Sequence, residues 1–326
     1  MPIFAVDKPL GITSHDAVAR SRRLLGTRKV GHAGTLDPLA TGVLVLLSHE
    51  ATKLSPFLSA GDKEYLAWVA FGLGTPTLDA EPPADPGALS RAEPRDLARL
   101  GAADVAPAAA SFLRVTTQRP PAYSAVQRAG VRSYAAARSG AAEEPPARPV
   151  GYRQVELLGF APRRAGLPNS FARVAEGWRP TPDRAGWTPT LPPELGELPT
   201  ALIALKVAAG TYIRSFARDL GAALGVPAHL SGLVRTAAGA VDLTDCGGLD
   251  ELATATPLDP AAVLPFPQLR LDAATAEAAR HGKQLDLDIA GTTALFDETG
   301  ALAAVVEPLG AGRMRYLRVW QRDLAP

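Results

Sequence analysis

The chain has 326 residues, enough for about two domains and a sizeable core. Hydrophobic residues make up 47% and charged residues 21%, which excludes a disordered polyelectrolyte. The longest clean apolar run, 42–47, is far shorter than the ~20 residues of a membrane-spanning helix, and the N-terminus lacks a signal-peptide pattern. A single cysteine, Cys246, excludes a disulfide framework and a cysteine-based metal site. Five widely spaced histidines predict no metal cluster, and we expect a cytoplasmic chain.

The net charge of +1 favours no partner, but the charges are segregated. Residues 1–40 hold six Lys/Arg against three Asp/Glu, residues 111–153 hold seven against two, and residues 205–240 hold four against one. Residues 75–105 are acidic, with six Asp/Glu against three Arg. Arginine pairs with phosphate through its planar fork, although GC-rich coding also favours arginine. The pattern favours a phosphate-rich partner, with 75–105 facing away from it.

Hydrophobic periodicity predicts alternating strands and helices along the first 245 residues. Ser14 is a candidate cap for the first helix, and Gly225 fits the end of the last one. In the first hundred residues we expect a strand over 2–7, a helix from Ser14 to Leu25, a Gly-rich loop over 31–38, a strand over 41–47, a helix over 51–58, a strand over 65–71 and a helix over 90–100. After these we expect a short helix over 132–139, strands over 153–160 and 200–207, a helix over 212–224 and a strand over 230–243.

Two segments depart from this pattern. Residues 161–199 hold eight prolines and little periodicity, so we expect an extended insertion without regular structure, in which Trp178 and Trp187 pack onto the core. A Pro/Ala-rich connection over 253–267 leads to a tail with strand-like segments at 286–290, 293–296, 302–306 and 315–320. The tail predicts a small separate β-domain.

The most informative segment is GHAGTLDPLATG, residues 31–42. Its glycines permit tight turns, and Pro38 biases Asp37 away from helical geometry, so that the carboxylate projects from a loop. Taken alone, Asp37 fits an ordinary turn aspartate and His32 a hydrogen-bonded loop residue; loops on rigid scaffolds are also where catalytic groups collect.

This segment, with VDKPLGITSHDAV before it, resembles the catalytic motif of the bacterial tRNA pseudouridine-55 synthases, the TruB family. Further matches follow in the same order: Lys63-Glu64-Tyr65, Pro121-Ala122-Tyr123-Ser124-Ala125, Gly210-Thr211-Tyr212-Ile213-Arg214 and His229-Leu230-Ser231-Gly232-Leu233. The resemblance spans about residues 4–245 apart from 161–199, and the tail is similar to the PUA domain of many members.

The resemblance implies an α/β (α+β) fold, a pseudouridine synthase core with a central mixed, mainly antiparallel sheet. It implies a catalytic domain over 1–252 and a PUA-like RNA-binding domain over 267–326. Asp37 matches the catalytic aspartate, Tyr65 the tyrosine that stacks on the target base, and Arg214 the arginine paired with that aspartate.

Other positions match substrate-binding or supporting residues of the family. His32 matches the histidine that reaches into the RNA loop, while Tyr212 and Leu233 match pocket positions. Lys8 and Pro9 match the motif that supports the pocket.

The implied reaction isomerises uridine 55 in the T loop of tRNA after the base is flipped. It involves no redox change or net hydrolysis, so we expect neither cofactor nor metal. A carboxylate such as Asp37 can act as nucleophile or base, and whether it attacks base or sugar or promotes a glycal route stays open. We expect tRNA as partner, with the C-terminal domain near the acceptor end, no guide RNA, no membrane and a monomer.

Three alternatives differ in testable ways. A guide-RNA-dependent synthase shares the motifs, but the short N-terminus and the bacterial-type motif set argue against it. A catalytically silent RNA-binding protein would not need Asp37 and Arg214. A glycosidase would need a second acidic group, and the sequence shows no acidic partner for Asp37.

Overall fold

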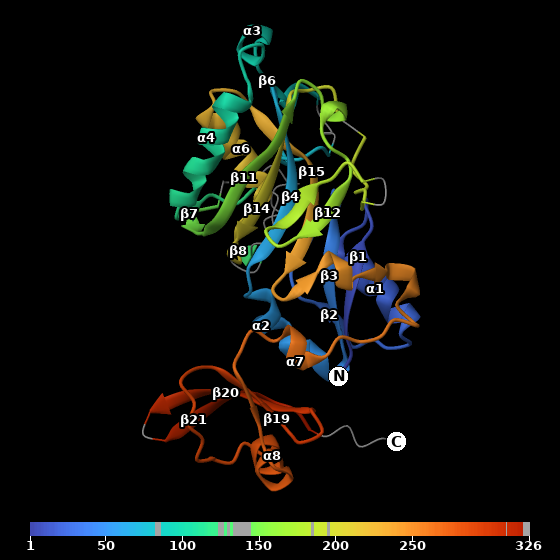
Figure 1. Cartoon of the computed structure of the whole chain (residues 1–326), viewed down its shortest axis with the longest axis vertical. Helices are drawn as coiled ribbons and strands as arrows, with labels where there is room; N and C mark the ends of the chain where they lie inside the picture. The colour runs from blue at the N-terminus through green and yellow to red at the C-terminus, as the bar shows by residue number, and fades with distance from the viewer. Residues whose placement is uncertain are drawn as a thin grey trace.

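A nine-stranded mixed sheet forms the centre of the molecule (Figure 1). The structure, a computed structural model, describes residues 1–81, 86–122, 127–128, 131–132, 145–183, 186–193, 196–310 and 312–321. The strand order is β11-β14-β4-β15-β3-β1-β17, with β16 joined to β15 and β2 to β3. The β15–β3 and β1–β17 pairs are parallel and the other pairs of this sheet are antiparallel, which confirms the predicted sheet. Its strands are β1 (Ile3–Lys8), β2 (Val30–His32), β3 (Ala40–Ser48), β4 (Lys63–Phe71), β11 (Tyr152–Ala161), β14 (Thr200–Val207), β15 (Ala228–Ala238), β16 (Val241–Asp242) and β17 (Gly247–Gly248).

Both faces of this sheet are covered, so the central strands β3 and β15 are buried along their whole length. Along β4, Leu66 and Trp68 belong to the core cluster on one face, and Ala67 and Val69 belong to the cluster on the other. This alternation follows from the two-residue period of a strand. The predicted strand over 200–207 coincides with β14.

Three helices pack on the face of the sheet that carries Ala67 and Val69. They are α1 (Ser14–Leu24), α4 (Ala102–Ser111) and α6 (Ile213–Ala223). Figure 1 shows α4 and α6 on the same side of the sheet. Helix α6 buries Phe216, whose ring meets Phe112 at 4.8 Å between centroids. Gly225, at φ 73°, follows the helix as predicted. Helix α4 was absent from the sequence prediction.

The cap of α1 differs from the prediction by one residue. Thr13 is the N-cap, and its hydroxyl accepts the backbone N–H of Asp16 at 3.0 Å. The Asp16 carboxylate accepts the Thr13 backbone N–H in return at 2.9 Å, which completes a capping box. Ser14 is instead buried, and its hydroxyl bonds the loop that follows β2.

The Pro-rich insertion packs on the opposite face. It contains a hairpin, β12 (Phe171–Val174) and β13 (Gly177–Pro180), so the expectation of no regular structure was wrong. Phe171 is fully buried, with its ring edge-to-face to Trp68 at 5.9 Å. Trp178 and Trp187 meet at 5.5 Å in the same cluster, which places both as packing residues.

The C-terminal segment forms a second, four-stranded sheet, β18-β19-β20-β21, with helix α8 (Figure 1). The segments 293–296, 302–306 and 315–320 correspond to strands, whereas 286–290 does not, and α8 and β18 were not predicted. Trp320 is 1% exposed, and its indole N–H donates to the carbonyl of Glu50 at 3.0 Å. The division into domains 1–252 and 267–326 stays a prediction. The elements here are α7 (Pro260–Val263), β18 (Gln268–Arg270), α8 (Ala273–Arg280), β19 (Thr293–Phe296), β20 (Leu302–Gly310) and β21 (Arg313–Val319).

Short elements connect these parts. The helix expected over 51–58 is a 3₁₀ helix followed by α2, and the segment 90–100 holds β6 and α3. Most of the helix expected over 132–139, together with Tyr123 and Ser124, lies outside the described residues. In the described part of the chain, no helix has the length and apolarity needed to cross a membrane. The short elements are η1 (His49–Leu54), α2 (Ser55–Ser59), β5 (Leu73–Gly74), η2 (Pro86–Ala88), β6 (Ser90–Arg91), α3 (Pro94–Leu97), η3 (Phe112–Arg114), β7 (Thr117–Gln118), β8 (Gln127–Arg128), β9 (Val131–Arg132), β10 (Arg148–Pro149), η4 (Arg164–Gly166), η5 (Leu243–Asp245) and η6 (Leu249–Glu251).

Candidate active site

The loop between β2 and β3 carries Asp37 and is held from several directions. The Ser14 hydroxyl accepts the N–H of Leu36 at 2.7 Å and donates to its carbonyl at 3.0 Å. The carbonyl of Pro38 accepts the N–H of Gly11 at 2.8 Å. These bonds fix the backbone on both sides of Asp37, as a preorganised site requires.

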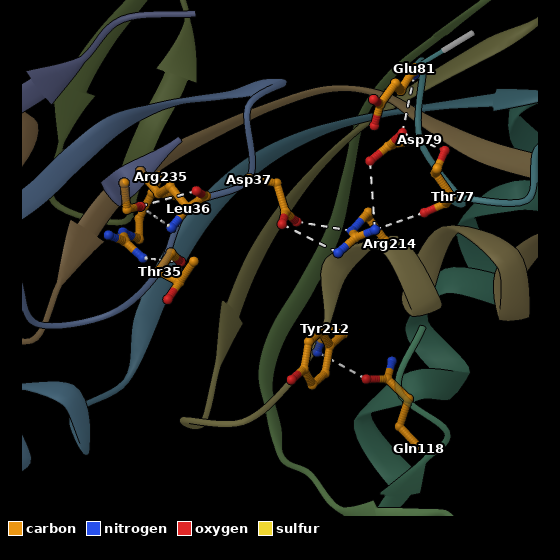
Figure 2. Close-up of polar contacts among 11 residues, drawn as sticks. Thr35, Leu36, Asp37, Thr77, Asp79, Glu81, Gln118, Tyr212, Arg214 and Arg235 are labelled. Carbon is orange, nitrogen blue, oxygen red and sulfur yellow. Dashed lines mark hydrogen bonds and ion pairs between the residues drawn. The ribbon is translucent and has the colours of Figure 1, made fainter. Parts of the chain in front are cut away.

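The Asp37 carboxylate pairs with Arg214, the second residue of α6. Arg214 Nε lies 2.9 Å from Oδ2, and Nη2 donates to Oδ1 at 3.2 Å (Figure 2). The Asp37 side chain is 35% exposed and that of Arg214 only 7%, so the carboxylate remains open to the cavity while the guanidinium is buried. This two-point arrangement fixes the orientation of the carboxylate.

The opposite side of the same guanidinium meets Asp79. Arg214 Nη1 lies 3.7 Å from Asp79 Oδ2 and donates to the carbonyl of Thr77 at 2.8 Å (Figure 2). Asp79 belongs to the acidic segment 75–105, and it is buried behind Arg214, outside the lining of the cavity; the expectation that this segment faces away from an RNA partner stays a prediction. Burial raises the pKa of Asp79, although a hydrogen bond from Thr77 and the charge of Arg214 act against that rise.

A cavity of about 270 Å³ opens beside Asp37. Its wall includes Tyr65 from β4, Leu233 from β15, and Tyr212 and Arg214 at the start of α6. Tyr65 and Leu233 come from neighbouring antiparallel strands, and both pack against the same core cluster. The structure therefore brings five of the seven predicted site residues around one cavity.

Tyr212 enters this wall because of its backbone. It is the N-cap of α6, and its N–H donates to the side-chain oxygen of Gln118 at 2.9 Å (Figure 2). Gln118 is itself buried, and its amide donates to the hydroxyl of Tyr152 at 2.8 Å. This chain of bonds fixes the point at which α6 starts, and thereby the position of Arg214.

Lys8 and His32, the other two predicted residues, do not line the cavity. Lys8 is fully buried, and its ammonium donates to the carbonyls of Pro9 at 2.9 Å and Ile12 at 2.7 Å, so it holds the turn between β1 and α1. Burial lowers the pKa of Lys8 to about 8. Burial, followed by the charge of Arg235, also lowers the pKa of the half-buried His32.

Two charged residues of the cavity lining, Lys63 and Arg235, were not predicted from the sequence as site residues. Lys63 precedes Tyr65 by two positions on β4, and its ammonium donates to the carbonyls of Ser59 and Gly61. Burial lowers the pKa of Lys63 to about 8. The described residues contain no group of three or more His, Cys, Asp or Glu side chains able to hold a metal ion.

Comparison with known proteins identifies the class. A sequence model described as "TruB family pseudouridylate synthase (N terminal domain)" matches residues 22–172. That description names a class of isomerases. The tRNA pseudouridine synthase B of Thermus thermophilus is 46% identical over 323 residues, covering 99% of this chain and all of the relative. The enzyme of the same name from Deinococcus radiodurans is 46% identical over 320 residues, covering 98% of this chain and all of the relative. The chain belongs to the TruB family.

A solved structure supports the same fold. The crystal structure of a Cbf5-Nop10-Gar1 complex contains a chain that matches with a TM-score of 0.62 at 21% identity. The match covers 98% of this chain and 85% of that chain. At this identity the similarity establishes the fold alone.

Proposed function

We propose that the chain isomerises uridine 55 in the T loop of tRNA to pseudouridine, with Asp37 as the catalytic residue. The observation that carries the proposal is the position of the Asp37 carboxylate. Arg214 holds it at two points, and it stays partly exposed beside a cavity lined by Tyr65 and Leu233. An ionised, oriented carboxylate next to an aromatic ring is what the reaction requires from a protein.

The chemistry replaces one glycosidic bond by another. The bond from C1′ of the ribose to N1 of uracil breaks, the base rotates, and a bond forms from C1′ to C5. The proton on C5 leaves, and N1 ends protonated, so that the product is an isomer of the substrate. Asp37 serves as nucleophile or base in this sequence, and Arg214 holds its carboxylate in place.

The target base has to leave the RNA stack to reach Asp37, because the carboxylate lies at a recessed cavity. Flipping costs roughly a few kcal/mol. Stacking on an aromatic ring recovers ~1–3 kcal/mol per base, and Tyr65 offers that ring. Leu233 supplies an apolar wall for the flipped base.

We further propose that the enzyme acts alone, as a cytoplasmic monomer without guide RNA or cofactor. The charge segregation supports binding of the phosphates of a folded RNA, and the C-terminal sheet provides a second surface for tRNA beyond the T loop. The Thermus and Deinococcus relatives are both named tRNA pseudouridine synthase B, which supports tRNA as the substrate.

The test uses purified protein and unmodified tRNA transcript, with no other component. Pseudouridine is mapped by chemical labelling, and a transcript with cytidine at position 55 is the control. We expect product at position 55 of the first transcript and none in the second. Product that forms only after a guide RNA is added, or that forms at another position, would overturn the proposal.

A further inference from the structure

Arg235 is a charged side chain placed inside the central sheet. It lies in β15, a strand in which every residue is buried, and it is 1% exposed. Arginine is almost never fully buried unless its donors are satisfied. The partners of its guanidinium therefore account for its position.

Those partners are backbone carbonyls at the start of the loop that carries Asp37 and in β3, the strand that follows the loop. Nε donates to the carbonyl of Val43 at 2.7 Å, Nη2 to that of Gly34 at 3.1 Å and Nη1 to that of Thr35 at 3.3 Å. Figure 2 shows Arg235 beside Thr35, on the side of Asp37 away from Arg214. One planar group thus joins the start of the loop to β3.

The backbone of Arg235 holds the same loop. It pairs with Gly42 in the parallel register of β15 and β3. Gly42 has φ 95°, and a Cβ at this position would lie 2.2 Å from the Arg235 carbonyl oxygen. The loop exit is therefore packed directly against Arg235, with no room for a side chain between them.

No carboxylate forms an ion pair with Arg235 among the residues that the structure describes. Its charge contributes to lowering the pKa of both Lys8 and Lys63, although burial is the larger cause for each lysine. A buried, unneutralised cation costs free energy, so it contributes little to stability as a charge. What it provides is geometry, because its fork reaches three separate acceptors.

We propose that Arg235 is a positioning residue for the isomerisation: it fixes the loop 34–43 so that the Asp37 carboxylate faces both Arg214 and the cavity. All three of its guanidinium nitrogens donate to carbonyls of the loop or of β3, so Arg235 acts through Asp37 although its side chain also lines the cavity wall. Misplacement of a reacting group by about 1 Å can cost 10²-fold in rate. The expected loss of rate rests on the proposed function, whereas the expected loosening of the loop does not.

The first arm of the test separates chemistry from binding. Arg235→Lys keeps the charge but loses the fork, and Arg235→Met removes all donors. Arg164→Lys is the matched control, because Arg164 lies in η4 and donates to the carbonyl of Ser231 on the same strand at 3.0 Å. Single-turnover rates at saturating enzyme should fall at least tenfold for Arg235→Lys and further for Arg235→Met. Affinity for tRNA should stay within about threefold, since a positioning residue acts on the rate.

The second arm does not depend on activity. Hydrogen exchange of the peptide 33–43 should accelerate at least tenfold in Arg235→Lys and stay unchanged in Arg164→Lys, because released loop amides open more often. Slow exchange in Arg235→Lys would overturn the inference even if the protein has no activity on tRNA. Weakened tRNA binding with an unchanged single-turnover rate would overturn it too, because that pattern indicates substrate contact. An inactive wild-type enzyme with a loop loosened by Arg235→Lys would overturn the proposed function alone.

Discussion

The Asp37 carboxylate lies edge-on to the Arg214 guanidinium, with Nε 2.9 Å from Oδ2 and Nη2 3.2 Å from Oδ1. The arginine comes from α6 and the aspartate from the loop before β3, so the pair joins two halves of the catalytic core. Because the guanidinium is buried and the carboxylate is partly open, this pair holds an anion at the edge of the cavity without closing it off.

Arg214→Lys tests that geometry. Lysine carries the same charge, but its ammonium is a point donor and cannot make the planar, two-point contact of a guanidinium with both carboxylate oxygens. We expect the single-turnover rate to fall by at least 10²-fold, while tRNA affinity changes by less than about threefold. Arg218→Lys, one turn further along α6, is the control, since Arg218 pairs with Asp219 instead of Asp37. Equal rates for the two variants would contradict a positioning role for the fork.

Asp79→Asn tests the other side of the guanidinium. The amide oxygen can still accept from the Thr77 hydroxyl and the Glu81 N–H, which bond Asp79 Oδ1 at 2.7 Å and 3.1 Å. Its NH₂ group would face Arg214 Nη1, donor against donor, where a carboxylate oxygen now lies at 3.7 Å. We expect a rate loss of about 10-fold to 100-fold with tRNA binding preserved. Asp219→Asn is the control, and an unchanged rate for Asp79→Asn would remove Asp79 from the site.

Lys8→Met tests the buried ammonium through pH. The pKa of Lys8 is lowered to about 8, so between about pH 8 and 10.5 the unfolded chain binds a proton that the folded chain does not. Its contribution to the free energy of unfolding therefore rises with pH across that window. The difference in stability, wild type minus Lys8→Met, should grow by roughly 3 kcal/mol from pH 7 to 10.5, at 1.36 kcal/mol per pKa unit. Denaturant unfolding at several pH values measures it, with exposed Lys29→Met as control; a difference that shrinks with pH would contradict the assignment.

The proposed binding of tRNA by the C-terminal sheet is tested by removing positive charges from it, instead of by deleting it. Removing 267–326 would expose the cluster that contains Phe296 and Trp320, and the loss of packing would obscure any effect on RNA. Arg313 and Arg318 are exposed on β21. Replacing both with Gln should weaken tRNA binding and reduce the slope of log affinity against log salt by about one for each phosphate that the protein no longer binds. Single-turnover rates at saturating enzyme should not change; a flat salt titration of the wild type would contradict the electrostatic argument.

The sequence predicted much of the fold because its central strands carry local signals. The run 200–207 and the helix with Phe216 on its buried face are readable from periodicity alone. The hairpin β12–β13 was missed because prolines surround it and its stability comes from long-range packing of Phe171 on Trp68. Helix α8 was missed although its cap is visible: the Asp272 carboxylate accepts the N–H of Thr275 at 2.9 Å.

Family motifs predicted which residues meet at the cavity of the candidate site, whereas residues that join it through long-range contacts were not predicted. Asp37, Arg214, Tyr65, Tyr212 and Leu233 came from family motifs, and all five line the cavity. Asp79 and Arg235 had no local signal. Asp79 looked like one more charge of an acidic segment, and its contact with Arg214 spans more than 130 residues of chain. Arg235 lies in a strand that is buried on both faces. Such a strand has no alternation of apolar and polar residues, so periodicity could not show that this arginine is buried.

Replacement of Asp37 by asparagine tests the central claim most directly. Asparagine keeps the shape of the side chain but removes the anion on which nucleophilic or basic chemistry depends. The measurement is pseudouridine formation at position 55 of an unmodified transcript, at saturating enzyme, alongside the dissociation constant for the same tRNA. We predict no detectable product from Asp37→Asn, with a dissociation constant within about threefold of the wild type. Substantial turnover by Asp37→Asn would contradict the account.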